Sequence, residues 1–252
     1  MILEIDQGNS RCKWRLRQGQ QHLQAGSGDT STGDYNQLFA ELRQPPAAVH
    51  VATVVPSRNP ALEHWCQQQW QLTPVYAQVT RVCGGVRNGY EDLQQMGVDR
   101  WLAMVAAYQL VASACVVVSA GTACTVDLVT ANGLHRGGFI GPGLQMMNNA
   151  LFRNTDQVKV PALIDSEGLI PGTSTAAAVS AGLRAMQLGL VLRGIRQLLI
   201  EADQPWLVIT GGGGQGLASL VTDSLVAEGV SHIVAGVRVV PELVLDGLLW
   251  GC

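Results

Sequence analysis

A short apolar strand that runs into an acidic, glycine-containing turn is the feature that most constrains what this chain can fold into. Residues 1–6 are predicted to form this strand, and residues 12–17 the strand that returns from the turn. Asp6 ends the first strand, where a carboxylate can hold a hydrated Mg²⁺. Gly8 lets a phosphate approach the backbone because glycine has no Cβ, and Lys13 adds a positive charge beside the phosphate oxygens. The pattern predicts a hairpin that grips a phosphate.

Two small polar residues, Asn9 and Ser10, complete this turn and offer hydrogen-bond donors to a phosphate. The same stretch also fits an ordinary β-turn, because Asp, Gly, Asn and Ser are all common turn formers. Short motifs match by chance often enough that this stretch alone does not decide between the two interpretations. The rest of the chain has to discriminate between them.

The composition suits a chain with a large core and argues against several kinds of partner. Hydrophobic residues make up 47% of the 252 residues, enough for one large domain or two moderate ones. The net charge of −3, with no basic stripe, argues against nucleic-acid binding. Apolar runs are interrupted well before the ~20 residues of a membrane span, and the acids Glu4 and Asp6 are unlike a signal peptide. We expect a cytoplasmic protein that binds neither nucleic acid nor membrane.

The cysteines and histidines form no metal-ligand pattern. No two cysteines make a CxxC pair, and the spacings match no zinc site. Reduced thiols are expected in a chain without a secretory signal. The six cysteines are Cys12, Cys66, Cys83, Cys115, Cys124 and Cys252.

The chain reads as two parts that open in the same way, with a boundary near residue 113. In each part an apolar strand meets a turn of small residues and glycine, and a second strand returns. Mixed strands and helices favour α/β layering, and a single α/β domain with two unrelated turns is the alternative. Further strands are predicted at 47–55, 75–79, 115–118, 124–129, 137–140 and 206–209, and helices at 34–43, 60–70, 97–114, 173–201 and 239–250.

The ordered set of motifs resembles one family. The arrangement is similar to the superfamily of sugar kinases, actin and heat-shock chaperone ATPases, and within it to the type III pantothenate kinases, some relatives of which are known as Bvg accessory factor-like proteins. The resemblance covers nearly the whole chain. It rests on Asp6-x-Gly8-Asn9-Ser10-x-x-Lys13, Asn88-Gly89-Tyr90, Gly97-Val98-Asp99-Arg100-Trp101, Ala120-Gly121-Thr122-Ala123, Gly138-Phe139-Ile140-Gly141-Pro142-Gly143, Gly172-Thr173-Ser174-Thr175 and Thr210-Gly211-Gly212-Gly213.

The resemblance implies both an architecture and an activity. It implies an α/β fold of two similar actin/ribonuclease H-like domains, 1–112 and 113–252, with the nucleotide cleft between them. The implied reaction is the ATP-dependent phosphorylation of pantothenate to 4'-phosphopantothenate, the first step of coenzyme A biosynthesis, with Mg²⁺ as cofactor and a homodimer as the working form. The ATP-binding residues would be Asp6, Gly8, Asn9, Ser10, Lys13, Thr122, Gly211 and Gly212.

The substrate side would be built around a helix start. A lone Asp at that position is usually a helix cap, but the resemblance makes Asp99 the base that accepts the proton of the pantothenate primary hydroxyl. Arg100 suits the pantothenate carboxylate, because a guanidinium binds a carboxylate in a fork. The resemblance adds Tyr90, Gly97, Val98 and Thr175 to the substrate-binding residues.

One residue departs from the family's pattern. Ser119 stands where the family usually has the aspartate associated with a monovalent cation, K⁺ or NH₄⁺. A neutral hydroxyl argues against a dedicated cation site, and whether Asp127 compensates stays open. Two alternatives to the enzyme remain: an accessory regulator of transcription with weak or no kinase activity, and a kinase for another small hydroxylated acid.

Overall fold

The computed structural model describes residues 1–29, 33–164 and 169–250. These residues divide into two compact units. The first unit takes in the described residues of 1–84, 90–106 and 243–250, and the second takes in 85–89 and the described residues of 107–242. The first unit therefore contains segments from both ends of the chain. The assignment of domains as 1–112 and 113–252 stays a prediction.

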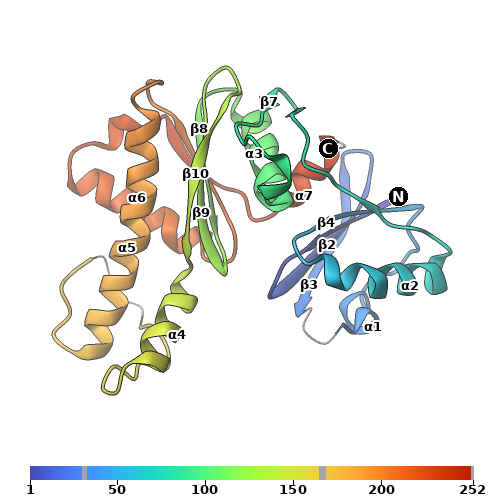
Figure 1. The fold of residues 1–252 in the computed structure, drawn as a ribbon, viewed down its shortest axis with the longest axis horizontal. Helices are drawn as coiled ribbons and strands as arrows, with labels where there is room; N and C mark the ends of the chain where they lie inside the picture. The colour runs from blue at the N-terminus through green and yellow to red at the C-terminus, as the bar shows by residue number, and fades with distance from the viewer. Residues whose placement is uncertain (30–32, 165–168, 251–252) are drawn as a thin grey trace. The chain divides into compact units, whose positions relative to one another are not determined.

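The first unit is built on a five-stranded sheet in the order β3-β2-β1-β4-β5 (Figure 1). Strand β1 pairs antiparallel with β2, which pairs antiparallel with β3, whereas β4 and β5 continue the sheet on the other side in parallel. The strands are β1 (Ile2–Gln7), β2 (Arg11–Gln18), β3 (Gln21–Asp29), β4 (Ala48–Thr53) and β5 (Val75–Tyr76).

The two faces of this sheet are covered by different segments. Because successive side chains of a strand point to opposite faces, Leu3 and Ile5 pack on one face with residues of α1 (Tyr35–Leu38) and α2 (Asn59–Trp70). Glu4 and Asp6 point to the opposite face. Packed on that face are α3 (Val98–Val111), α7 (Leu243–Gly247) and the turn η4 (Leu248–Trp250), which share an apolar cluster with Ala52 of β4.

The second unit repeats the same sheet. Its strands are β8 (Cys115–Ala120), β9 (Ala123–Val129), β10 (His135–Pro142), β11 (Trp206–Thr210) and β12 (Gly236–Val239), in the order β10-β9-β8-β11-β12. Here too the first three strands are antiparallel and the last two are parallel additions. The predicted α/β fold with two similar parts is confirmed, and the alternative of one domain with two unrelated turns is wrong.

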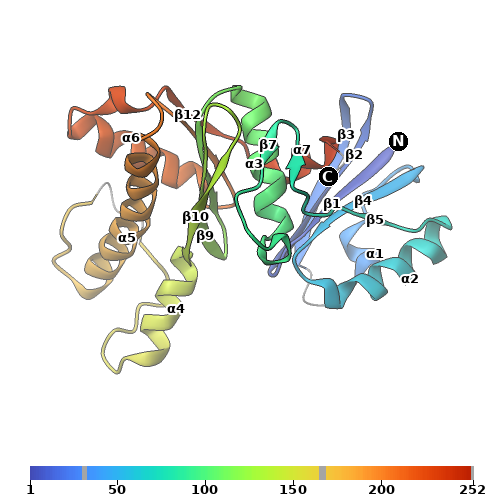
Figure 2. The same cartoon turned by 45° about the horizontal axis from the view of Figure 1, so that its top comes forward.

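Helices of the second unit pack on its sheet. Helix α5 (Thr175–Leu198) runs alongside β9 and β10 (Figures 1 and 2). Gly194 lets it approach closely, since a Cβ there would lie 2.5 Å from Cγ1 of Val126. The other helices of this unit are α4 (Leu144–Asn154) and α6 (Gly214–Ala227).

The sequence predictions missed some elements and gave wrong bounds for others. Strand β3 was not predicted because most of its residues are exposed and polar, and α6 was missed because it begins inside a run of glycines. The predicted helix 34–43 shortens to α1. The predicted helix 239–250 is wrong at its start, because β12 continues to Val239 and Pro241 precedes the short α7.

Two findings bear on the expectations drawn from composition, and only the one on the cysteines is a correction. Helix α5 is long and apolar enough, by length and composition alone, to cross a membrane, although the core helix of a soluble protein can pass the same test. Its residues Leu188, Val191 and Ile195 belong to the core of the second unit. The expectation of reduced cysteines holds for four buried thiols, whereas Cys83 is disulfide-bonded. The free thiols are Cys12, Cys66, Cys115 and Cys124.

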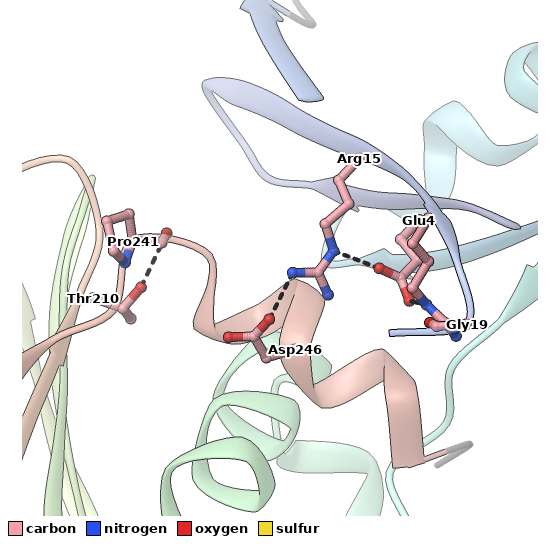
Figure 3. A network of polar contacts seen from close by, with 7 residues as sticks. Glu4, Arg15, Gly19, Thr210, Pro241 and Asp246 are labelled. Atoms are coloured by element: carbon pink, nitrogen blue, oxygen red, sulfur yellow. Dashed lines mark hydrogen bonds and ion pairs between the residues drawn. The ribbon is translucent and has the colours of Figure 1, made fainter. Parts of the chain in front are cut away.

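A buried ion network supports the first sheet (Figure 3). Arg15 Nε donates to Glu4 Oε2 at 2.6 Å, and Arg15 Nη1 donates to Asp246 Oδ1 at 2.6 Å. Arg17 also pairs with Glu4. The side chains of Glu4 and Arg15 are 0% and 1% exposed, so each charge depends on its partners for the stabilisation that water would otherwise give.

We predict that Glu4→Gln destabilises the chain by about 3 kcal/mol, because it leaves the Arg15 charge buried with Asp246 alone. Urea unfolding followed by circular dichroism measures the change. The matched control is Glu41→Gln, at an exposed position. A loss no larger than that of the control would contradict a supporting role for the pair.

Candidate active site

The first phosphate turn joins β1 to β2 and has the predicted form. Asp6 and Lys13 are register partners on the two strands, so both side chains stand at the turn end of the hairpin. The Gly8 N–H donates to the Arg11 carbonyl at 3.0 Å and closes the turn. A Cβ at position 8 would lie 3.0 Å from that same oxygen, so glycine keeps the turn narrow. Asn9 and Ser10 form its exposed tip.

Two residues that were not predicted from the sequence, Arg58 and Gln7, hold this turn and the strand before it in place through hydrogen bonds. Arg58 donates from Nη1 to the Gly8 carbonyl and from Nη2 to the Asn9 carbonyl, each at 3.2 Å. Gln7, fully buried, donates to Thr53 Oγ1 at 3.1 Å and accepts from the Tyr35 hydroxyl at 3.1 Å. No local motif marks either residue, because their partners lie far away along the chain.

The predicted base stands in the first turn of α3. Asp99 Oδ1 accepts a hydrogen bond from the Arg100 N–H at 2.8 Å. A Cβ on Gly97 would lie 2.6 Å from that oxygen, so the glycine leaves room for the carboxylate. Val98, the next residue, packs in the apolar cluster with Ala52. The glycine and the valine together therefore set the position of the Asp99 carboxylate.

Arg100 and Tyr90 come together as a pair. Arg100 Nη1 donates to the Tyr90 hydroxyl at 3.0 Å, and its guanidinium lies 5.6 Å from the centre of the tyrosine ring. Arg100 is only 7% exposed, which is unusual for an arginine. A third arginine, Arg81, was not predicted. It donates to the carbonyls of Tyr90 at 2.6 Å and of Glu91 at 3.1 Å, and so holds the loop that carries the tyrosine.

Asp6 and Asp99 interact electrostatically. Burial and, next, the negative charge of Asp99 raise the pKa of Asp6 from 3.8 to about 7, while Lys13 acts in the opposite direction. The first unit therefore brings two carboxylates from separate elements, the end of β1 and the start of α3, close to one another and to one lysine. Such an arrangement favours a bound cation.

The second unit carries the equivalent turn without the acid. Ser119 is the fifth residue of β8, as Asp6 is the fifth residue of β1, and each strand occupies the same place in its sheet. The Gly121 N–H donates to the Ala123 carbonyl at 3.0 Å, so a backbone bond closes this turn as it does the first, with one residue fewer between the bonded groups. Thr122 therefore stands at the tip of the second turn, as Asn9 does at that of the first.

Glycines let two other motifs pack against this turn. A Cβ on Gly143 would lie 2.1 Å from the Gly121 carbonyl oxygen, and a Cβ on Gly211 would lie 2.6 Å from that of Ala120. Gly211 also has φ +90°, a conformation that favours glycine. Gly212 has open space around it. The second phosphate turn, the glycine-proline loop and the glycine run thus meet at one end of the second sheet.

The remaining predicted residues of the second unit lie apart from those contacts or have other partners. Thr175 is exposed in the first turn of α5, where Ser174 caps the helix by accepting from the Ala177 N–H. Asp127 is buried, and its Oδ1 lies 3.2 Å from Nε2 of the buried His135. The carboxylate of Asp127 is therefore engaged by the imidazole.

The chain is similar to known proteins along its whole length. The family model described as type III pantothenate kinase matches residues 2–197. A type III pantothenate kinase of Ectopseudomonas mendocina is 38% identical, over 100% of this chain and 99% of its own length. One from Pseudomonas aeruginosa is 36% identical with the same coverage.

The chain belongs to the type III pantothenate kinase family. The predicted family is thereby confirmed. As a member the chain is a kinase, a transferase whose acceptor is an alcohol group, and its activity is the ATP-dependent phosphorylation of pantothenate. A nucleotide-associated divalent cation belongs to that chemistry.

Solved structures agree with the fold. A Campylobacter jejuni protein assigned to the Baf family of transcriptional activators aligns with a TM-score of 0.52 at 22% identity, over 98% of this chain and 95% of that chain. A 2-dehydro-3-deoxygalactonokinase protein of Sinorhizobium meliloti aligns with a TM-score of 0.56 at 15% identity, over 99% and 97%. At these identities the likeness extends to the fold alone.

Proposed function

We propose that this pantothenate kinase uses Asp99 as the general base for transfer of the γ-phosphoryl group of ATP to the primary hydroxyl of pantothenate. The observation that carries the proposal is the packing of Val98, next to Asp99, in one apolar cluster with Ala52, the register partner of Asp6. The electrostatic effect of Asp99 on Asp6 agrees with this placement. Phosphoryl transfer depends mostly on positioning and on stabilisation of charge. A carboxylate held near the phosphate turn is well placed to accept the hydroxyl proton as the oxygen attacks.

Arg100 would bind the pantothenate carboxylate through its guanidinium fork. Its burial supports this role, since a charged group withdrawn from water gains most from an ionic partner. Tyr90 accepts a hydrogen bond from Arg100, which orients the guanidinium. Gly97 and Val98 would shape the same pocket, and Thr175 would offer its hydroxyl to the polar part of the substrate.

Asp6 would hold the divalent cation, which we propose is Mg²⁺, through a water molecule. The residues fit such an ion, because two neighbouring carboxylates with one lysine leave an excess of negative charge. Among residues 1–29, 33–164 and 169–250, no group of three or more His, Cys, Asp or Glu could hold a metal by itself. Phosphate oxygens and water would complete the coordination, as is usual for Mg²⁺. Bound there, the ion would neutralise charge on the phosphates.

The nucleotide would be held by backbone groups and small side chains. In the first unit these are Gly8, Asn9, Ser10 and Lys13. In the second unit they are Thr122, Gly211 and Gly212, and the open space at Gly212 supports close approach of a ligand. Arg58, which binds two carbonyls of the first turn, would keep that turn in a fixed shape for a phosphate.

The second candidate function is an accessory role in transcription. The Campylobacter jejuni protein named above carries such a description, but its identity to this chain is only 22%. A regulator without catalysis has no need for a base and a buried arginine in the same helix turn. We favour the enzyme for that reason, and we propose that it is cytoplasmic and binds neither nucleic acid nor membrane.

We predict that Asp99→Asn lowers kcat by ~10²–10⁴-fold, because the amide keeps the shape of the side chain but cannot accept the proton. ADP release coupled to NADH oxidation measures the rate, and circular dichroism checks the fold. The matched control is Asp223→Asn, at an exposed position of α6. Near-native turnover of a folded Asp99→Asn would refute the assignment.

The monovalent cation is a separate question, raised by Ser119. A neutral hydroxyl compensates a cation poorly for the loss of its water, and Asp127 is engaged by His135. We propose that charge at the phosphates comes from Mg²⁺, Lys13 and backbone N–H groups, without a dedicated site for K⁺ or NH₄⁺.

We therefore predict a rate that requires Mg²⁺ but changes less than about twofold with K⁺. Initial rates are measured against K⁺ concentration, with ionic strength balanced by a bulky organic cation, in the native chain and in Ser119→Asp. The aspartate is expected to create a K⁺ response. Strong, saturable activation of the native chain would show that the serine does not abolish the site.

We also propose that the working form is a homodimer. Helix α5 presents exposed apolar residues as well as its buried ones, and Met186 is 63% exposed. Exposed apolar surface of this kind is typical of protein contacts when it forms a patch.

Light scattering at micromolar concentration is predicted to give about twice the chain mass of 26.8 kDa. Met186→Glu should lower the average mass, because it places a charge in the contact. A clean monomer with full activity would contradict the proposal.

A further inference from the structure

The last described segment of the chain lies against the helix that carries Asp99. Leu245 and Leu248 share an apolar cluster with Val98 and Leu102 of α3. At Gly247 the two backbones come very close, because a Cβ there would lie 2.4 Å from the Leu102 carbonyl oxygen. Leu102 follows Asp99 by three residues, so the contact falls about one helical turn from the acid, on the same side of α3.

The same segment is tied to the strands of the phosphate hairpin. Asp246, next to Gly247, accepts a hydrogen bond from Arg15 Nη1 at 2.6 Å, and Arg15 in turn donates to Glu4 (Figure 3). Glu4 and Arg15 are register partners, and the next pair on that face of the sheet is Asp6 with Lys13. The ion network therefore lies two residues along each strand from Asp6 and Lys13.

We propose that Asp246 is a positioning residue for phosphoryl transfer. Its ion pair with Arg15 fixes α7 on β1 and β2. Because Gly247 of α7 contacts Leu102 of α3 closely, the fixed α7 in turn fixes the start of α3 relative to those strands. The position of Asp99 relative to Asp6 is then set by α7. The inference rests on the proposed role of Asp99 as the base, and it adds a residue that touches neither substrate nor phosphate.

The ion pair supplies a constraint that apolar packing lacks. Apolar contacts among Leu245, Leu248 and Leu102 favour burial but tolerate sliding, since the hydrophobic effect is not directional. A charge-assisted hydrogen bond fixes both distance and direction. Displacement of a reacting group by about 1 Å can cost on the order of 10²-fold in rate. A fixed α7 therefore matters for turnover as well as for stability.

The experiment compares Asp246→Asn in the native chain and in Asp99→Asn. In the native chain it should lower kcat by about 10- to 100-fold with little change in KM for pantothenate. In Asp99→Asn the same change should lower the residual kcat less than about twofold, because the group being positioned is already lost. Asp246→Glu should recover most of the rate, since Asp246 is 34% exposed and has room to adjust. Asp223→Asn again serves as the control.

A second readout does not depend on activity. Hydrogen exchange of the amides of residues 98–104 should speed up in Asp246→Asn, while that of α2 should not change. Equal losses of kcat in both backgrounds, or unchanged exchange in α3, would overturn the inference and leave the proposed function intact. A fully active Asp99→Asn would overturn both.

Discussion

The repulsion between the carboxylates of Asp6 and Asp99 is the constraint on which the rest of the site depends. One acid lies near the end of the first strand of a sheet, and the other lies in the first turn of a helix that covers that sheet. Burial and, next, the negative charge of Asp99 raise the pKa of Asp6 to about 7. Such a pair persists only where the surrounding structure holds both groups in place. Lys13 offsets part of the charge, and Gly97 makes room for Asp99. The proposed roles of the two carboxylates, holding a cation and accepting a hydroxyl proton, depend on this arrangement.

The two units share one sheet topology but carry different side chains at the equivalent turn. Both sheets have the same order, and both have a closed glycine turn after the first strand. In the first unit that turn is preceded by Asp6 and faced by a lysine. In the second it is preceded by Ser119 and crowded by the backbone at Gly143 and Gly211. The acidic chemistry is thus concentrated in one half, and the other half offers backbone and small side chains.

Local patterns were sufficient to predict much of this fold. The apolar runs at β1, β8 and β11 and the long apolar periodicity of α3 predict their own elements, because burial of those residues leaves few alternatives. The same reasoning missed β3, whose polar residues lack a buried face, and misplaced the start of the last helix, where Pro241 interrupts the pattern.

The site residues divide in the same way. Asp6, Gly8 and Asp99 stand in motifs that can be read along the chain. Arg58 and Arg81 hold backbone carbonyls of loops that they do not belong to, and Asp246 meets Arg15 across 231 positions of sequence. Nothing in the neighbouring residues of these three indicates such partners, because each contact is created by the fold.

The central claim is that this chain transfers the γ-phosphoryl group of ATP to the primary hydroxyl of pantothenate, with Asp6 and Asp99 at the site of transfer. The most direct test measures ADP release from ATP and Mg²⁺ with pantothenate, and with an analogue in which hydrogen replaces that hydroxyl, followed by mass spectrometry of the product. The account predicts ADP release only with pantothenate, matched one for one by a product carrying one added phosphoryl group. ADP release that is the same with the analogue, or its absence from a folded chain supplied with pantothenate, would contradict it.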